Sequence, residues 1–94
     1  MALARVVTFD GVSKERMDEM DREMQSGQPP EGMPSAELIV LHDPDAEKSV
    51  AIVIFDSEED YKKGDEILGG MPAGETPGTR TSVTKYNVAT RMKS

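Results

Sequence analysis

The chain has 94 residues, seven methionines, no cysteine and no tryptophan, and its net charge at pH 7 is -7. We predict a single domain over residues 1–94 with a thin core, because a chain this short buries only about 60–65 % of its unfolded surface. The absence of cysteine excludes disulfide bonds and thiolate metal sites and favours a cytoplasmic protein. No apolar segment approaches the roughly 20 residues of a membrane span, and the net charge argues against nucleic acid or an anionic membrane as a partner.

The beginning of the chain predicts a strand followed by a helix. Residues 3–9 (LARVVTF) are mostly β-branched, aromatic or aliphatic and precede an Asp-Gly turn signal, so they predict a strand. Ser13 can cap a helix that runs to about residue 25, and we expect Gly27 to stop it in the left-handed conformation. Three methionines at helical spacing predict the buried stripe of this helix, which we interpret as flexible core packing in preference to a ligand groove: Met17, Met20 and Met24.

The rest of the chain predicts a β-hairpin, a second helix and a last strand. Residues 36–42 (AELIVLH) and 50–55 (VAIVIF) flank a polar turn, which is typical of a hairpin. Ser57, with an aspartate three residues later, predicts the start of a helix over 58–68. Gly64 inside that helix costs about 1 kcal/mol relative to alanine, so we expect the helix to lie close to the sheet there. The alternation in TSVTKYNVAT predicts the last strand over 81–90.

This order of elements, βαββαβ, predicts an α+β ferredoxin-like sandwich, with a four-stranded antiparallel sheet and both helices on one face. A Gly-Met-Pro triplet occurs in both helix-to-strand loops, at Gly32 and Gly70. The repeat follows the internal symmetry of the fold and places the two loops at opposite ends of the sheet. We expect Met33 and Met71 to be at least half buried, each filling the gap between a helix end and the next strand.

The predicted strands are apolar on both faces, whereas a sheet with one solvated face should alternate apolar with polar residues. In residues 50–55 both alternating sets are apolar, and the chain has no third helix to cover the second face. A second copy of the sheet would cover it, so we predict a homodimer. The final segment is basic and the first half is acidic, which favours pairing within the fold or across the dimer over a site for an anionic ligand.

The pattern of these elements, including the hairpin HDPDAEKSVAIVIFDSEEDYKKGDEIL and the last strand TSVTKYNVAT, resembles the dimeric α+β barrel superfamily. It is most similar to the antibiotic-biosynthesis-monooxygenase-like (ABM-like) branch, and the resemblance covers nearly the whole chain. It implies sheets paired back to back in a dimer and a ligand cavity between each sheet and its own helices. Cofactor-free monooxygenases of this superfamily use Asn, Trp and Tyr side chains, and its haem-degrading relatives use Asn, Trp and His.

The chain contains only part of these catalytic sets. It has no Trp, one Asn (Asn87) and one His (His42), so the haem-degrading set cannot form and the monooxygenase set is incomplete. Tyr86 and Asn87 are adjacent and point to opposite faces, so at most one of them lines the cavity. We interpret His42 as an exposed or edge residue without a catalytic role, and the DPDAEK turn lacks the glycine and glutamate of a calcium loop. No nucleotide-binding or nucleophile motif is present, and we expect no cofactor and no metal.

Three hypotheses about function remain. The first is a dimer that binds a small apolar or aromatic molecule between sheet and helices. The second is a cofactor-independent monooxygenase-like or isomerase-like enzyme of the same superfamily, and the third is a dimeric scaffold without a ligand. The missing Trp and the isolated His favour the first hypothesis. Its candidate ligand-binding residues are the polar groups expected near the cavity: Arg5, Tyr61, Arg80, Lys85 and Tyr86.

Overall fold

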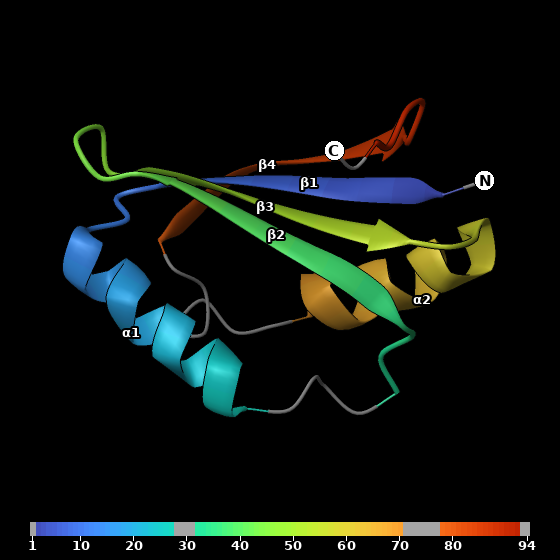
Figure 1. The fold of residues 1–94 in the computed structure, drawn as a ribbon, viewed down its shortest axis with the longest axis horizontal. Helices are drawn as coiled ribbons and strands as arrows, with labels where there is room; N and C mark the ends of the chain where they lie inside the picture. The colour runs from blue at the N-terminus through green and yellow to red at the C-terminus, as the bar shows by residue number, and fades with distance from the viewer. Residues whose placement is uncertain (1, 28–31, 71–77, 93–94) are drawn as a thin grey trace.

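The computed structural model of the protein describes residues 2–27, 32–70 and 78–92. They form a sheet with both helices on the same side of it, as Figure 1 shows. The predicted ferredoxin-like βαββαβ fold is therefore confirmed. In chain order the elements are β1 (Leu3–Asp10), α1 (Lys14–Ser26), β2 (Ala36–Asp43), β3 (Lys48–Phe55), α2 (Glu58–Gly69) and β4 (Thr79–Asn87).

The sheet has the strand order β2-β3-β1-β4, and all its pairings are antiparallel. β1 lies between β3 and β4, and its pairing with β4 shifts register between Thr8 and Phe9. β2 begins at the end of the sheet where Leu3 pairs with Phe55, and β4 begins at the other end, where Thr79 pairs with Asp10. The strands that follow the two helix-to-strand loops thus begin at opposite ends of the sheet, as predicted.

Alternation of side chains divides the sheet into two faces. Leu3 and Phe55 pack against Tyr61 of α2, so they lie on the side of the helices, which we name the helix face. The pairing register extends this face along the strands, and the alternate residues form the opposite side, which we name the open face. The helix face carries Leu3, Arg5, Val7, Phe9, Ala36, Leu38, Val40, His42, Ala51, Val53, Phe55, Val83, Lys85 and Asn87, and the open face carries Ala4, Val6, Thr8, Glu37, Ile39, Leu41, Val50, Ile52, Ile54, Thr84 and Tyr86.

The buried core lies on the helix face in two clusters. Leu3, Val53, Phe55 and Tyr61 form the first, at the α2 end of the sheet, with Met33 and Leu68 packed against it. The second comprises Val7, Phe9 and Val12, with Met17 and Ala51 packed against it. The predicted burial of Met33 is confirmed, whereas Met71 lies outside the described residues.

Both predicted helix starts are confirmed, because Ser13 and Ser57 cap α1 and α2 and accept hydrogen bonds from the amides of Arg16 and Asp60. The predicted left-handed stop at Gly27 is wrong, since this residue has φ -88° and ψ 173°. Its amide instead donates to the carbonyl oxygen of Glu23, and a Cβ atom at Gly27 would lie 2.7 Å from that oxygen. A close approach of backbone to backbone therefore explains glycine at this position.

Gly64 is buried, and a Cβ atom there would lie 2.2 Å from Cζ of Phe55. The expected close contact between α2 and the sheet is confirmed. The predicted stripe of α1 is correct only in part, because Met17 packs in the core but Met24 is exposed. Figure 1 shows the reason: the C-terminal end of α1 slants away from the sheet. The last strand begins two residues earlier and ends three residues earlier than predicted.

Candidate functional site

A group of charged and polar residues lies on the helix face beside α2. We name it the Arg5 cluster; it comprises Arg5, Glu58, Tyr61, Asp65 and Lys85. Arg5 of β1 and Lys85 of β4 are partners in the pairing register, so their side chains lie side by side on one face. The other members come from α2 at spacings of three and four residues, which places them on the side of the helix that meets the sheet.

Each cation of the cluster contacts a carboxylate of α2. Arg5 Nε donates to Asp65 Oδ1 at 2.8 Å, and the Lys85 ammonium donates to Glu58. Lys85 Nζ also lies 5.0 Å from the centre of the Tyr61 ring, in a cation–π arrangement. Three of the five residues proposed from the sequence, Arg5, Tyr61 and Lys85, are thus brought together.

The surroundings of Tyr61 keep its hydroxyl protonated. Burial raises the pKa of Tyr61, and the negative charge of Asp65 raises it further, while Arg5 and Lys85 oppose the shift. A neutral phenol can donate a hydrogen bond to a ligand but is a poor base near neutral pH. The hydrogen bond from Lys85 lowers the pKa of the exposed Glu58, which keeps that carboxylate ionised. The cluster can therefore bind and orient polar groups, with cations and a phenol as donors.

The other two candidate residues lie elsewhere. Tyr86 is adjacent to Lys85 but pairs with Ala4 on the open face, where it is exposed. Arg80 precedes Lys85 by five residues, roughly 16 Å along an extended strand, and lies opposite Phe9 near the other end of β1. Asn87 pairs with Leu3 on the helix face, so it lies on the opposite side of β4 from Tyr86, as the alternation predicted.

The sequence interpretation missed Glu58 and Asp65. A signal was present, because these acids and Tyr61 occupy one side of α2 at positions i, i+3 and i+7. Cations on the facing strands were available as partners for both acids. What the sequence did not reveal was which cation each acid would contact.

His42 and the turn after it have structural contacts. Nε2 of His42 lies 2.9 Å from the carbonyl oxygen of Val12, so this nitrogen donates a hydrogen bond. The bond links the end of β2 to the residue just before the N-cap of α1. In the turn, Oδ1 of Asp43 accepts from the amides of Asp45 and Ala46, which is an ordinary turn arrangement. Among the residues that the structure describes, no group of three or more potential ligands could hold a metal ion.

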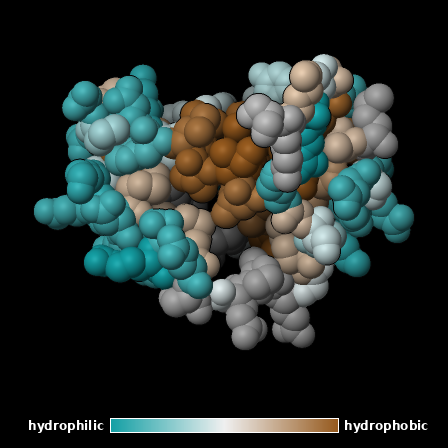
Figure 2. Space-filling model, in the orientation of Figure 1, coloured by the Kyte–Doolittle hydropathy of each residue, from teal (hydrophilic) through white to brown (hydrophobic). Residues whose placement is uncertain are grey.

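Exposed apolar side chains lie at both edges of the helix face, on β2 and on β4. Leu38 of β2 is 51 % exposed and Val83 of β4 is 43 % exposed, although both point to the side of the helices. Figure 2 shows hydrophobic surface in the middle of the molecule, at the position of β2, between the hydrophilic surfaces of α1 and α2. The two helices therefore leave part of the helix face uncovered.

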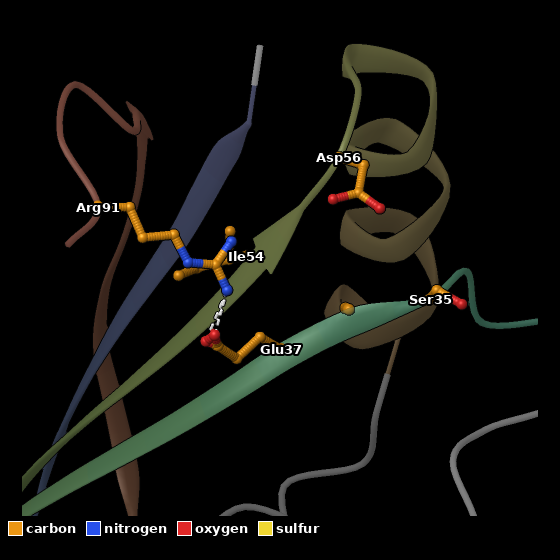
Figure 3. A pocket seen from close by; sticks show the side chains of 6 residues that line it. Ser35, Glu37, Ile54, Asp56 and Arg91 are labelled. Atoms are coloured by element: carbon orange, nitrogen blue, oxygen red, sulfur yellow. Dashed lines mark hydrogen bonds and ion pairs between the residues drawn. The ribbon is translucent and has the colours of Figure 1, made fainter. Parts of the chain in front are cut away.

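A separate depression of about 230 Å³ lies on the open face near the start of β2. Figure 3 shows Arg91, from the segment after β4, reaching across Ile54 to the carboxylate of Glu37. This ion pair joins the basic final segment to the acidic first half of the chain, as the charge distribution in the sequence favoured. The depression is smaller than the roughly 300–1,000 Å³ of typical ligand pockets, and its cation already has a partner. Its remaining lining residues are Ser35, Ala36 and Asp56.

No protein-family model and no curated protein matches this sequence. The fold is similar to the solved structure of a protein described as a "putative Antibiotic biosynthesis monooxygenase" from Chloroflexus aurantiacus J-10-fl. The two chains share 14 % sequence identity with a TM-score of 0.61, over 99 % of this chain and 98 % of the other. The ABM-like α+β fold that the sequence pattern indicated is therefore confirmed, and at this identity the similarity concerns the fold. None of the helices in the described part of the chain is long and apolar enough to cross a membrane.

Proposed function

We propose that this protein is a single-domain cytoplasmic homodimer that binds a small apolar or aromatic molecule between the sheet and the helices of each subunit. The observation that carries the proposal is the set of exposed apolar side chains at the edges of the helix face, together with the Arg5 cluster. Small-molecule sites usually combine an apolar lining with a few polar groups that fix the orientation of the ligand. Leu38 at the β2 edge of the sheet and Val83 at the β4 edge provide exposed apolar side chains, and the Arg5 cluster provides the polar groups.

The open face supports the dimer. Ile39 and Leu41 are exposed there, and Val50, Ile52 and Ile54 beside them are only partly buried in one subunit. Covering these side chains with a second sheet would remove apolar area from water, with a gain of about 25 cal/mol per Å². A partner on the open face also leaves the helix face of each subunit free for a ligand. The two apolar surfaces thus have two different occupants.

Leu38 and Leu41 provide a matched pair of positions to test this division. Both lie on β2, and they are 51 % and 52 % exposed, but they lie on the helix face and the open face respectively. Titration of Nile red, an uncharged aromatic dye, should show saturable binding to the parent protein. Leu38→Gln should weaken that binding by about tenfold, because a leucine side chain contributes about 1.5 kcal/mol or more when buried. Leu41→Gln should leave dye affinity close to that of the parent and reduce the fraction of dimer measured by light scattering.

Two outcomes contradict the proposal. If the parent binds no dye, the third hypothesis, a scaffold without a ligand, is the better description. If Leu41→Gln removes dye binding and Leu38→Gln does not, the hydrophobic site is on the open face. Measuring light scattering on the same samples separates loss of the dimer from loss of the dye.

The alternative of a cofactor-independent oxygenase is favoured by the structural similarity to the Chloroflexus protein, by Asn87 on the helix face, and by Tyr61 of α2, which packs against that face. Such an enzyme would convert a phenol to a quinone, with O₂ supplying one oxygen atom to the product and one to water. An oxygen electrode with 1-naphthol as the substrate tests this reaction. Uptake that depends on Tyr61, measured against Tyr61→Phe, would support the enzyme. Oxygen uptake no faster than that of 1-naphthol without the protein would contradict the enzyme hypothesis and favour the hypothesis of a binding protein.

A further inference from the structure

Arg5 is an unusual residue for an inner strand of the sheet. Only 5 % of its surface is exposed, and it lies between β3 and β4 under α2. A guanidinium group stays charged at all ordinary pH values, so its burial is costly unless anionic partners and hydrogen bonds replace water. The contacts of this side chain therefore show how much of that requirement the protein itself meets.

The protein meets only part of it. Among the residues that the structure describes, the side-chain hydrogen bond of Arg5 is the single bond from Nε to Asp65 at 2.8 Å. The N–H groups on the two terminal nitrogens have no hydrogen-bond partner in that part of the chain. Within the same described residues, however, every side-chain nitrogen that is fully buried has a partner. The terminal nitrogens of Arg5 are therefore not fully buried and keep a small contact with solvent. The side chain of Asp65 is 47 % exposed, so water still shares its carboxylate with Arg5.

The surroundings of Arg5 change from charged to apolar across the sheet. The pairing register aligns Lys85, Arg5, Val53 and Leu38 in one row on the helix face, with neighbouring strands roughly 4.8 Å apart. On the β4 side of Arg5, the ammonium group of Lys85 already has two partners, Glu58 and the ring of Tyr61. On the other side, Val53 and the exposed Leu38 extend roughly 10 Å away from the guanidinium.

We propose that the ligand of the helix-face site carries a carboxylate or a similar planar anion, which the terminal nitrogens of Arg5 bind. The apolar body of the ligand points toward the β2 edge of the sheet, where Leu38 is exposed. A carboxylate can accept two parallel hydrogen bonds from a guanidinium, which matches the donors that Asp65 leaves unused. This inference rests on the proposed binding function and specifies the chemical class of its ligand, an aromatic or aliphatic acid.

A pair of probes of equal shape tests the inference: 2-naphthoate, which is an anion, and 2-naphthamide, which is neutral. Binding of each is measured by isothermal titration calorimetry with the parent protein and three variants. The parent should bind the acid at least about tenfold more tightly than the amide. Arg5→Gln should remove this preference and keep the affinity for the amide. Arg80→Gln, which removes the same charge at the other end of β4, should keep the preference.

Asp65→Asn should act in the opposite direction. It removes the carboxylate that competes for Arg5, so the acid should bind more tightly than to the parent while the affinity for the amide stays unchanged. A purely structural Arg5–Asp65 pair predicts no such gain. This variant also keeps the test decisive if Arg5→Gln does not fold.

The outcomes separate the two proposals. If both probes bind with equal affinity, or if Asp65→Asn gives no gain for the acid, the assignment of Arg5 is overturned and the binding site remains. If neither probe and no dye binds the parent, the proposed function itself fails. If Arg80→Gln removes the preference as Arg5→Gln does, the effect comes from net charge and the assignment is also overturned.

Discussion

Replacing Gly64 by alanine tests the closest contact between α2 and the sheet. A methyl group at this position would lie 2.2 Å and 2.3 Å from Cζ and Cε1 of Phe55. Normal carbon–carbon contacts are about 3.5–4.0 Å, so the overlap is roughly 1.5 Å. Phe55 is fully buried and its ring packs edge-to-face on Tyr61 with centroids 5.8 Å apart, so the ring cannot move without disturbing a second aromatic residue.

Two effects of opposite sign determine how much Gly64→Ala changes the free energy of unfolding. Alanine is the better helix former by about 1 kcal/mol in a helix interior. Overpacking of a core costs about 1–3 kcal/mol, and the upper part of this range applies where the neighbouring ring is confined. The net loss for Gly64→Ala is therefore about 1–2 kcal/mol of unfolding free energy. For a chain of this size the melting temperature should fall on the order of 5–15 °C.

Gly69→Ala is the matched control, because this residue ends the same helix and a Cβ atom there would meet nothing within 4 Å. Urea unfolding followed by circular dichroism should show Gly69→Ala at least as stable as the parent and Gly64→Ala less stable. Adding Phe55→Leu should reduce the cost of Gly64→Ala, since the smaller side chain leaves room for the methyl group. If Gly64→Ala and Gly69→Ala unfold at the same urea concentration, the described contact does not limit this position.

Three further predictions concern the two faces, Tyr61 and the first loop. Ile52→Asp, on the open face, should give the monomer mass of 10.3 kDa in light scattering at micromolar concentration. Val53→Asp, at a buried position of the helix face, should lose several kcal/mol of a total unfolding free energy of about 5–15 kcal/mol, and equal behaviour of the two variants would refute the assignment of faces. The raised pKa of Tyr61 means that the folded state holds this proton more tightly than the unfolded state, so stability is complete below about pH 10 and falls as the pH rises further. Tyr61→Phe should reduce that alkaline loss in urea midpoints measured from about pH 8 to 11, and an unchanged slope would contradict the assignment. Met33→Ala should cost about 2–3 kcal/mol, at the low end for a buried methionine because Met33 is only partly buried; a variant that melts like the parent would mean that the loop does not depend on it.

Much of the fold follows from local patterns in the sequence. Ser13 and Ser57 cap helices because their hydroxyls reach amides within the first turn, which depends only on neighbouring residues. The order βαββαβ follows from periodicity and turn residues in the same way. The apolar character of both faces of residues 50–55 was also readable, since alternation alone assigns those side chains to opposite sides.

Other features depend on segments far apart in the sequence. Met24 is exposed because α1 leaves the sheet, which the spacing within the helix does not show, so its predicted burial was incorrect. The prediction for Gly27 failed for a local reason instead, because its amide contacts the carbonyl oxygen of Glu23 four residues earlier. The candidate site is a stronger case. Arg5 and Asp65 are separated by sixty positions, and the strand register decides that Lys85 joins them while its neighbour Tyr86 faces the other side. The sequence by itself determined the elements and their apolar faces, because these arise from contacts a few residues apart, whereas only the tertiary structure decided which charges meet, because register and helix placement bring distant residues together.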